Sequence, residues 1–483
     1  MVRWFLKGTK WSLVSSFLTC ASLIVAILLG DSQPTYTLPL HKVMAIPAFA
    51  RKYGLPCSAC HTAWPELNNF GQVFRDNGYQ LENDRDSPIW QNPTYFPITF
   101  RITPNWHRES TDHQAVDAVA GNRASGFVER RVTQHGFDLS GMDLWTAGTL
   151  YKNISFVLLP STDNTAAFHF EAAFVRFDNL LKSSWLNLRV GRFELDNLIS
   201  EKRFLFLSAN GGSYQNYHFV PVGDSNNFGI GDNQLGLELA GHATNSYTRY
   251  GVAVVSSNEG GVGFNDVGGS PNTGRTYDTY LTFMQGFQAG KLGLQRLQAF
   301  VYLGRRATVF NQTVGGAVIP ATGTGNKGFY RAGFQGNFFL GKLDFLPFFE
   351  HGYDNVFLGT STPGNQALPA GARAPTWNGG FIETHYYFNP QLVFTQRWEI
   401  VRMSQQALPG NPSDLGNVDA YSFGYRWYPI MFSRAGLAWH NEYSIVKTIG
   451  TGPLSGNGSG VPPLSLNTPV WSSSIFIGFD FDF

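Results

Sequence analysis

Two thiols three positions apart, followed at once by an imidazole, occur at Cys57, Cys60 and His61. This spacing is the attachment pattern of a c-type haem. Each cysteine can form a thioether to one vinyl group of the porphyrin, and the histidine is then held where its ring nitrogen can bind the iron. The pattern predicts one covalent haem c on Cys57 and Cys60. His61 is the expected axial ligand of the haem iron, and the distal ligand is not identified.

The same residues allow two other interpretations. A structural zinc site needs about four ligands, and the sequence has no second Cys/His cluster nearby. A thiol redox pair belongs with a strand-helix-strand pattern, which does not surround this motif. The third cysteine, Cys20, lies in the expected leader, so the exported chain keeps no disulfide framework.

The N-terminus has the pattern of a secretory signal. Arg3, Lys7 and Lys10 precede an apolar stretch from about residue 11 to residue 29, which predicts a signal peptide over residues 1–30. Cleavage as late as residue 45 and an uncleaved membrane anchor are the alternatives. Export agrees with the haem, because thioether attachment takes place outside the bacterial cytoplasm.

Residues 45–90 form the expected monohaem segment. Trp64-Pro65-Glu66-Leu67 resembles a helix start, because proline favours the first helical position. Leu67, Phe70, Val73 and Phe74 then recur at helical spacing, and Asn77-Gly78 predicts the helix end. About 40 residues are near the lower limit for independent folding, so we expect haem and a larger body to supply the missing contacts.

The composition indicates β-strands that contact lipid. Charged residues make up 14% of the 483-residue chain and aromatic residues 15%, and 53 residues are glycine. Soluble domains average about 25% charged residues and about 7% glycine. After residue 30 no run of about 18 apolar residues could span a bilayer as a helix. A net charge of +1 gives no argument for nucleic acid.

Apolar and polar residues alternate in strand-like segments from about residue 95 to Phe483, which predicts an all-β, transmembrane antiparallel barrel over 95–483. About sixteen strands are expected, an even number. They are expected at 95–103, 127–138, 144–159, 166–177, 185–193, 234–241, 247–255, 276–287, 295–304, 328–340, 343–350, 379–388, 391–401, 419–428, 433–446 and 471–483.

The connections are expected to alternate in length. Short turns such as Gly341-Lys342 lie at one end, and long loops such as 194–233 lie at the other, as in outer-membrane barrels with short periplasmic turns. Sixteen strands enclose an aqueous interior. Its polar lining is expected to include Arg101, Glu171, Arg189, Glu383, Arg397, Glu399, Arg426, Arg434, His169, His385 and His440. A distal haem ligand among them, or at His41 or Met44, stays open.

The haem motif and its flanks resemble the fused cytochrome–porin outer-membrane proteins, a family that includes bacterial Fe(II) oxidases. The resemblance rests on Ala45–Arg51, Gly54, the motif at 57–61, Pro65–Gly71, Phe74 and Asn77–Tyr79. Local similarity covers about 35 residues, and the order of parts matches across the chain.

An even number of strands puts Phe483 and the start of the first strand at the same, periplasmic end, so the N-terminal haem segment is expected to enter from the periplasmic side. Because the haem must bridge part of the hydrophobic layer, residues 45–90 are expected to plug the barrel. The resemblance implies an outer-membrane protein. It implies oxidation of extracellular Fe(II) by an oxidoreductase that passes electrons through the haem to a periplasmic carrier, a cytochrome or a copper protein. Two alternatives remain, a haem-bearing channel for small solutes and outward electron transfer to an extracellular acceptor. The sequence offers no iron-site motif, since the acids of the outer loops are scattered.

Overall fold

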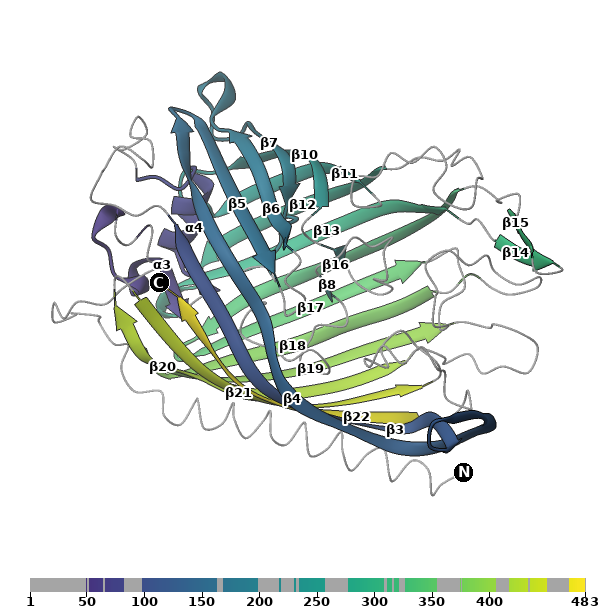
Figure 1. Cartoon of the computed structure of the whole chain (residues 1–483). Helices are drawn as coiled ribbons and strands as arrows, with labels where there is room; N and C mark the ends of the chain where they lie inside the picture. The colour runs from purple at the N-terminus through teal and green to yellow at the C-terminus, as the bar shows by residue number, and fades with distance from the viewer. Residues whose placement is uncertain are drawn as a thin grey trace.

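Figure 1 gives the computed structural model of the chain. It describes residues 49, 52–63, 66–81, 98–162, 168–198, 217–218, 230–231, 234–256, 277–307, 311–314, 317–320, 326–353, 374, 376–404, 417–432, 435–449 and 469–482. In these ranges no helix is long and apolar enough to cross a membrane. The expected signal peptide and its cleavage region up to residue 45, together with His41 and Met44, lie outside the described residues.

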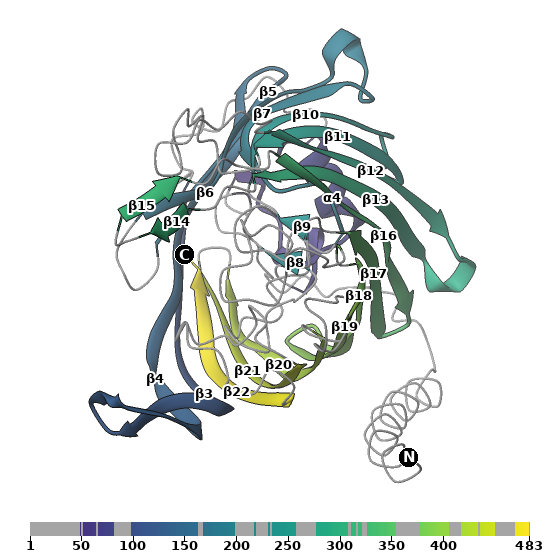
Figure 2. The same cartoon turned by 90° about the vertical axis from the view of Figure 1, so that its right-hand side faces the viewer.

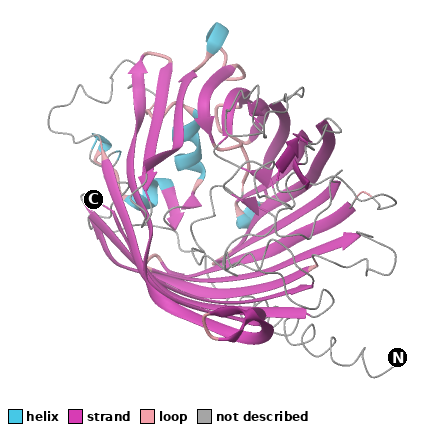
Figure 3. Ribbon diagram, turned by 45° about the vertical axis from the view of Figure 1, so that its right-hand side comes forward, coloured by secondary structure: helices cyan, strands magenta, loops and turns pink. Residues whose placement is uncertain are grey.

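Sixteen antiparallel strands close into one barrel, and strand dominates the described chain (Figure 3). In chain order they are β3 (Thr99–Val119), β4 (Asn122–Tyr151), β5 (Ile154–Thr162), β6 (Phe168–Phe177), β7 (Asn187–Phe193), β10 (Gln234–His242), β11 (Thr248–Ser256), β12 (Tyr277–Gln288), β13 (Leu294–Ala307), β16 (Asn326–Leu340), β17 (Leu343–Tyr353), β18 (Thr376–Asn389), β19 (Leu392–Ser404), β20 (Val418–Phe432), β21 (Ala435–Ile449) and β22 (Pro469–Asp482). The ring closes where β22 pairs with β3, with Asp482 opposite Arg101. The predicted antiparallel barrel of about sixteen strands is confirmed.

The remaining elements are short. Two short 3₁₀ helices are η1 (Leu180–Lys182) and η4 (Gly290–Leu292). Three two-stranded sheets pair β1 (His61–Ala63) with β2 (Glu66–Leu67), β8 (Tyr217–His218) with β9 (Ile230–Gly231), and β14 (Asn311–Val314) with β15 (Ala317–Pro320). The α-helices are α3 (Cys57–Cys60) and α4 (Asn69–Asp76). Figure 2, a view turned by 90°, shows α4 surrounded by the ring of strands.

Alternation along each strand separates an apolar outside from a mostly polar inside. On β10, Leu235 and Leu237 are exposed, whereas Gln234 and Glu238 are buried. A continuous apolar exterior suits contact with lipid, and a closed ring leaves no unpaired strand edge in a medium without water. Exposed aromatic side chains lie near the short turns, where an interfacial girdle is expected. They are Trp185, Phe287, Phe388, Trp427 and Trp439.

Part of the inner wall is apolar, which the prediction of a polar lining missed. Phe348 of β17 stacks on Phe381 of the neighbouring β18 and, across β16, on Phe300 of β13, with ring centroids 5.0 Å and 5.6 Å apart. They belong to a buried cluster against which Phe49 and Tyr79 of the N-terminal segment pack. An inward apolar surface of this kind needs a partner other than water, and the segment supplies part of one.

The first strands differ from the prediction. The expected strand 144–159 is wrong, because the chain turns at Lys152 and Asn153 between β4 and β5. Lys152 takes a positive φ of 43°, a conformation for which its residue type gives no signal. Segments 127–138 and 144–151 join in one strand, β4, so the total stays at sixteen.

The β3–β4 hairpin is far longer than the expected strand 95–103. The pairing of β3 with β22 ends at Thr111, but β3 stays paired with β4 as far as Val119. Figure 1 shows this hairpin, labelled β3 and β4, projecting beyond the neighbouring strands at the lower right. Residues 104–126 carry polar side chains on both faces, so the apolar alternation that identifies a half-buried strand is missing there.

The short turns gather at one end of the barrel, here called the short-turn end. Gly341 and Lys342 join β16 to β17, and Pro390 and Gln391 join β18 to β19. β3 begins and β22 ends at this same end, as their pairing requires. The expected end of the strand 419–428 is displaced, because β20 continues to Phe432.

Candidate functional site

The haem motif begins a compact segment of four short elements. α3 carries Cys57 and Cys60, and β1, which begins at His61, pairs with β2. The predicted helix start at Pro65 is wrong, because Glu66 and Leu67 form β2 and α4 begins only at Asn69. Asparagine is a stronger N-cap than the residues before it, and Asn68 accepts a hydrogen bond from the Gly71 N–H at 3.0 Å. The predicted helix end at Asn77-Gly78 is confirmed, with φ +81° at Gly78.

Asn68 also ties α4 to the motif. Its Nδ2 donates to the backbone carbonyls of Ser58 at 3.2 Å and Ala59 at 3.0 Å, and its backbone N–H donates to the Cys60 carbonyl at 2.9 Å. One side chain therefore caps the helix and satisfies carbonyl groups of α3. This fixes the helix relative to Cys60 and His61.

The first turn of α4 approaches Cys60 so closely that only glycine fits. A Cβ at Gly71 would lie 2.2 Å from the Cys60 carbonyl oxygen and 2.9 Å from Cδ2 of Leu67. We expect Gly71→Ala to destabilise the packing of α4 on α3 by about 1–3 kcal/mol, the usual cost of overpacking. The rate of chymotrypsin cleavage within residues 52–81 of the folded barrel measures this effect.

Gly136→Ala is the matched control, because nothing lies within 4 Å of a Cβ at that position of β4. We expect chymotrypsin to cleave this variant at the wild-type rate. If Gly71→Ala resists chymotrypsin as well as the wild type does, the close approach of α4 to Cys60 does not stabilise the segment.

The end of α4 is held by the barrel wall. Arg176 of β6 donates from Nη2 to the carbonyls of Arg75 at 3.1 Å and Asp76 at 2.8 Å. A guanidinium at a helix C-terminus satisfies carbonyls that have no partner in the helix and faces the negative end of its dipole. Arg249 of β11 approaches Oδ1 of Asp76 to 3.6 Å.

Asp76 lies among positive charges inside the barrel. Burial alone would raise the pKa of its carboxyl, but Arg249, His242 and Arg75 together outweigh burial and hold the pKa below its ordinary value. Asp76 therefore stays ionised in the docked segment. Asp196, three residues after β7, pairs with Arg249 and lies 3.8 Å from Arg75, so the contact is a network of two carboxylates and two guanidinium groups.

Aromatic side chains of the N-terminal segment pack against Phe74 of α4. The Phe74 ring meets Phe49 edge-on at 5.0 Å and Tyr53 at 5.7 Å, while Phe49 stacks on Tyr79 at 5.6 Å. Of the predicted apolar stripe, Phe74 is buried but Phe70 is 44% exposed. Burial raises the pKa of Tyr79, so its hydroxyl stays neutral.

A cavity of about 220 Å³ lies between this segment and the wall, and Cys60 and His61 both line it. His61 is buried, with 7% of its surface exposed. Apolar walls come from both sides and include Leu67, Phe74, Trp145, Val157, Leu159 and Phe174. Arginines from five elements also line it, namely Arg75, Arg101, Arg176, Arg189 and Arg249.

These residues fit a c-type haem. Cys60 supplies a thiol and His61 an imidazole at the cavity surface, and the apolar side chains could cover a porphyrin face. The arginines that line the cavity pair with carboxylates of the protein, as Arg189 does with Glu238 and Arg101 with Asp480. Burial raises the pKa of the Cys60 thiol to about 11. At neutral pH it is a protonated thiol, which weakens the thiol redox interpretation, because the thiolate is the reactive form.

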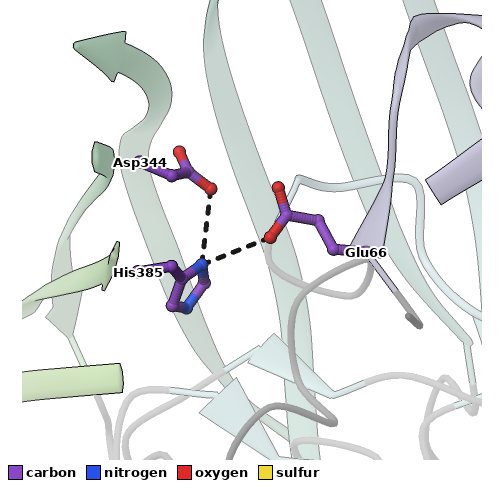
Figure 4. A group of neighbouring side chains, drawn as sticks. All are labelled: Glu66, Asp344 and His385. Atoms are coloured by element: carbon purple, nitrogen blue, oxygen red, sulfur yellow. Dashed lines mark hydrogen bonds and ion pairs between the residues drawn. The ribbon is translucent and has the colours of Figure 1, made fainter. Parts of the chain in front are cut away.

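A second polar group joins the segment to the opposite wall. Glu66 of β2, Asp344 of β17 and His385 of β18 point toward one another (Figure 4). His385 was expected in the lumen from the alternation along its strand, whereas Glu66 and Asp344 were not expected there. The alternation of Glu383, His385 and Tyr387 on one face of β18 was the signal available.

The other predicted lining residues can now be placed. Arg101, Glu383, Arg397, Glu399, Arg426, His385 and His440 are buried, and Glu171 and Arg189 line the cavity. Asp480 joins two of the arginines, at 3.4 Å from Arg101 and 2.8 Å from Arg426. Arg434, the His169 side chain and the scattered acids of the outer loops lie outside the described residues.

No protein-family model and no curated protein sequence matches the chain. Among solved structures it is similar to OmpT, an outer membrane protein of Vibrio cholerae, at 10% identity over 80% of this chain and 98% of that one, with a TM-score of 0.41. The anion-selective porin from Comamonas acidovorans shares 11% identity over 80% and 98%, with a TM-score of 0.45. OmpF of Salmonella typhi, in complex with daunomycin, shares 10% over 80% and 97%, with a TM-score of 0.46. The barrel assignment rests on this chain's own strand pairing.

Proposed function

We propose that this protein is an outer-membrane electron-transfer protein with one c-type haem on Cys57, Cys60 and His61, held inside the barrel at the periplasmic end. Its donor is extracellular Fe(II), and a periplasmic cytochrome or copper protein accepts the electrons. The membrane location is supported by the closed strand ring and its apolar exterior.

One observation carries the proposal. The Cys-x-x-Cys-His segment lies within the strand ring, where Cys60 and His61 line a cavity with apolar walls and arginine side chains. A haem bound there would supply one-electron redox chemistry. The protein's own residues hold the segment in place through Arg176 and Asn68, exclude water through Phe74 and Phe49, and present His61 to the cavity.

A haem segment inside the barrel suits a reaction that must carry electrons across the outer membrane. Fe(III) precipitates at neutral pH, so a cell gains by leaving iron outside and importing only the electron. A redox group must then bridge part of a hydrophobic layer about 25 Å thick. A segment fixed inside the barrel shortens that gap, whereas a segment hanging below the short-turn end would not.

Anaerobic mixing of the purified, detergent-solubilised protein with Fe(II) tests this function. We expect the reduced c-type haem spectrum to appear on mixing, because Fe(II) is the proposed donor. Reduction by dithionite but not by Fe(II) would overturn iron oxidation and favour outward electron transfer to an extracellular acceptor. Absence of a haem spectrum would overturn the electron-transfer function itself.

A small-solute channel is the second candidate, favoured by the charged residues along the barrel's inner wall. A sixteen-strand barrel encloses enough space for an aqueous pore. Swelling of liposomes that contain the protein in sugar solutions separates the two functions. Rapid sugar entry would support the channel, and its absence would support a plugged barrel.

A further inference from the structure

Three buried side chains from three separate elements converge on one point inside the barrel (Figure 4). Nδ1 of His385 lies 3.2 Å from Oε2 of Glu66 and 3.3 Å from Oδ2 of Asp344. All three side chains are 0% exposed, and their ligand atoms lie within 4.8 Å of one another. Two carboxylates and an imidazole are a donor set that first-row divalent transition metals accept.

The spacing suits a shared ion. Nitrogen and oxygen ligands lie ~2.0–2.2 Å from such an ion, which puts neighbouring ligand atoms ~3.0 Å apart at right angles and ~3.4 Å apart in a tetrahedron. The two measured N···O distances fall in this interval. A single Nδ1–H could point well at only one of the two carboxylates, whereas one cation would be shared by all three ligand atoms.

The groups behind the ligands hold them in the orientation that a metal needs. Nε2 of His385 lies 2.6 Å from Oε1 of Glu383, whose other oxygen is 3.6 Å from Nη1 of Arg397. A hydrogen bond from Nε2–H to this carboxylate would leave the Nδ1 lone pair facing Glu66 and Asp344. A carboxylate behind the distal ring nitrogen is the usual support of a metal-binding histidine.

The two carboxylates are also oriented by hydrogen bonds. The Tyr387 hydroxyl donates to Oε2 of Glu66 at 2.7 Å, and Nδ2 of Asn337 donates to Oδ1 of Asp344. Each carboxylate is therefore fixed before any ion arrives. A preformed ligand set loses little side-chain entropy on binding.

We propose that Glu66, Asp344 and His385 bind one first-row divalent metal ion. Its identity as Fe(II) rests on the proposed function, but binding itself does not. β2, which carries Glu66, pairs with β1, where Leu67 lies opposite His61. An ion here would thus be held by the same two-stranded sheet as the expected haem ligand. The competing interpretation is a metal-free anchor in which a protonated His385 bridges the two carboxylates.

Titration of the purified full-length protein with Mn(II), followed by electron paramagnetic resonance of the free ion, tests the proposal. We expect one Mn(II) bound per barrel, displaced by Zn(II) and by anaerobic Fe(II). Asp344→Asn and His385→Gln should each weaken binding by at least about tenfold, and Glu383→Gln by about 10–100-fold, as for outer-shell partners generally.

Asp278→Asn is the matched control. Asp278 is also a fully buried carboxylate of the inner wall, but its partner is the Tyr302 hydroxyl at 2.8 Å, which an asparagine oxygen can still accept. We expect unchanged Mn(II) affinity in this variant. Pulsed resonance of bound Mn(II) should show an imidazole nitrogen in the wild type and lose it in His385→Gln.

Absence of Mn(II) binding to folded wild-type protein would overturn the proposal and leave the metal-free anchor. Equal affinity in wild type, Asp344→Asn and His385→Gln would also overturn it. The haem spectrum of the same sample is a separate readout. A missing haem with intact Mn(II) binding refutes the proposed function alone, and a normal haem without Mn(II) binding refutes the metal site alone.

Discussion

Replacing Cys57 and Cys60 together by alanine is expected to remove all covalently bound haem from the protein. Each thiol supplies one thioether to the porphyrin, so the double variant has no attachment point. Replacing Cys60 alone should leave one bond and a reduced yield. Acid–acetone extraction followed by haem staining of a denaturing gel measures only the covalent fraction, and full loss is expected in the double variant.

The third cysteine provides the control. Cys20 lies in the expected leader, so Cys20→Ala should keep the wild-type haem content in whatever protein is exported. Haem that survives extraction in the Cys57→Ala/Cys60→Ala variant would show that another residue attaches it. A wild-type protein without extractable or covalent haem would refute the cofactor assignment.

The barrel could be predicted because lipid contact imposes a strict pattern on each strand. Where one face is apolar and the other polar, as at 234–241 and 471–483, the expected strand agrees with β10 and β22 to within two residues. The prediction failed where that constraint is absent. The projecting β3–β4 hairpin is polar on both faces, and the β4–β5 turn at Lys152 lacks glycine or proline.

The site could be predicted only where its residues are adjacent in sequence. Cys57, Cys60 and His61 form a local motif, so spacing alone identified them. Asp344 and His385 are 41 positions apart on the paired strands β17 and β18, and Glu66 lies more than 200 positions before them, so the three meet only because the barrel surrounds the docked segment. The arginines around the cavity could not be predicted as a set either, because each belongs to a different helix or strand.

Asp76→Asn is expected to loosen the N-terminal segment strongly from the barrel wall. The variant removes one of the two carboxylates beside Arg249 and Arg75, and Asp196 remains paired with both. Losing one charged partner in this way costs about 1.5–3 kcal/mol. Since tenfold in an equilibrium is about 1.4 kcal/mol, the released population should rise about 10–100-fold. Chymotrypsin cleavage of the segment at pH 7 tracks that population when opening is fast.

The same contact predicts a pH dependence with a definite sign. The pKa of Asp76 is lower in the docked segment than its ordinary value of 3.8, so its contribution is fully present above that value. It is lost as the pH falls below 3.8, because the Asp76 carboxyl is then protonated in the released segment but still ionised in the docked segment. The near-ultraviolet circular dichroism of Phe49, Phe74 and Tyr79 should therefore weaken on acidification in the wild type, and this component should be missing in Asp76→Asn.

Asp419→Asn separates this effect from a general loss of charge. Asp419 pairs with Arg402 where both side chains are more than 40% exposed, and exposed pairs contribute about 0–1 kcal/mol. Its cleavage rate and acid response should match the wild type. If Asp76→Asn and Asp419→Asn behave alike, the buried charge contact does not hold the segment, and the Arg176 hydrogen bonds and aromatic packing must do so without it.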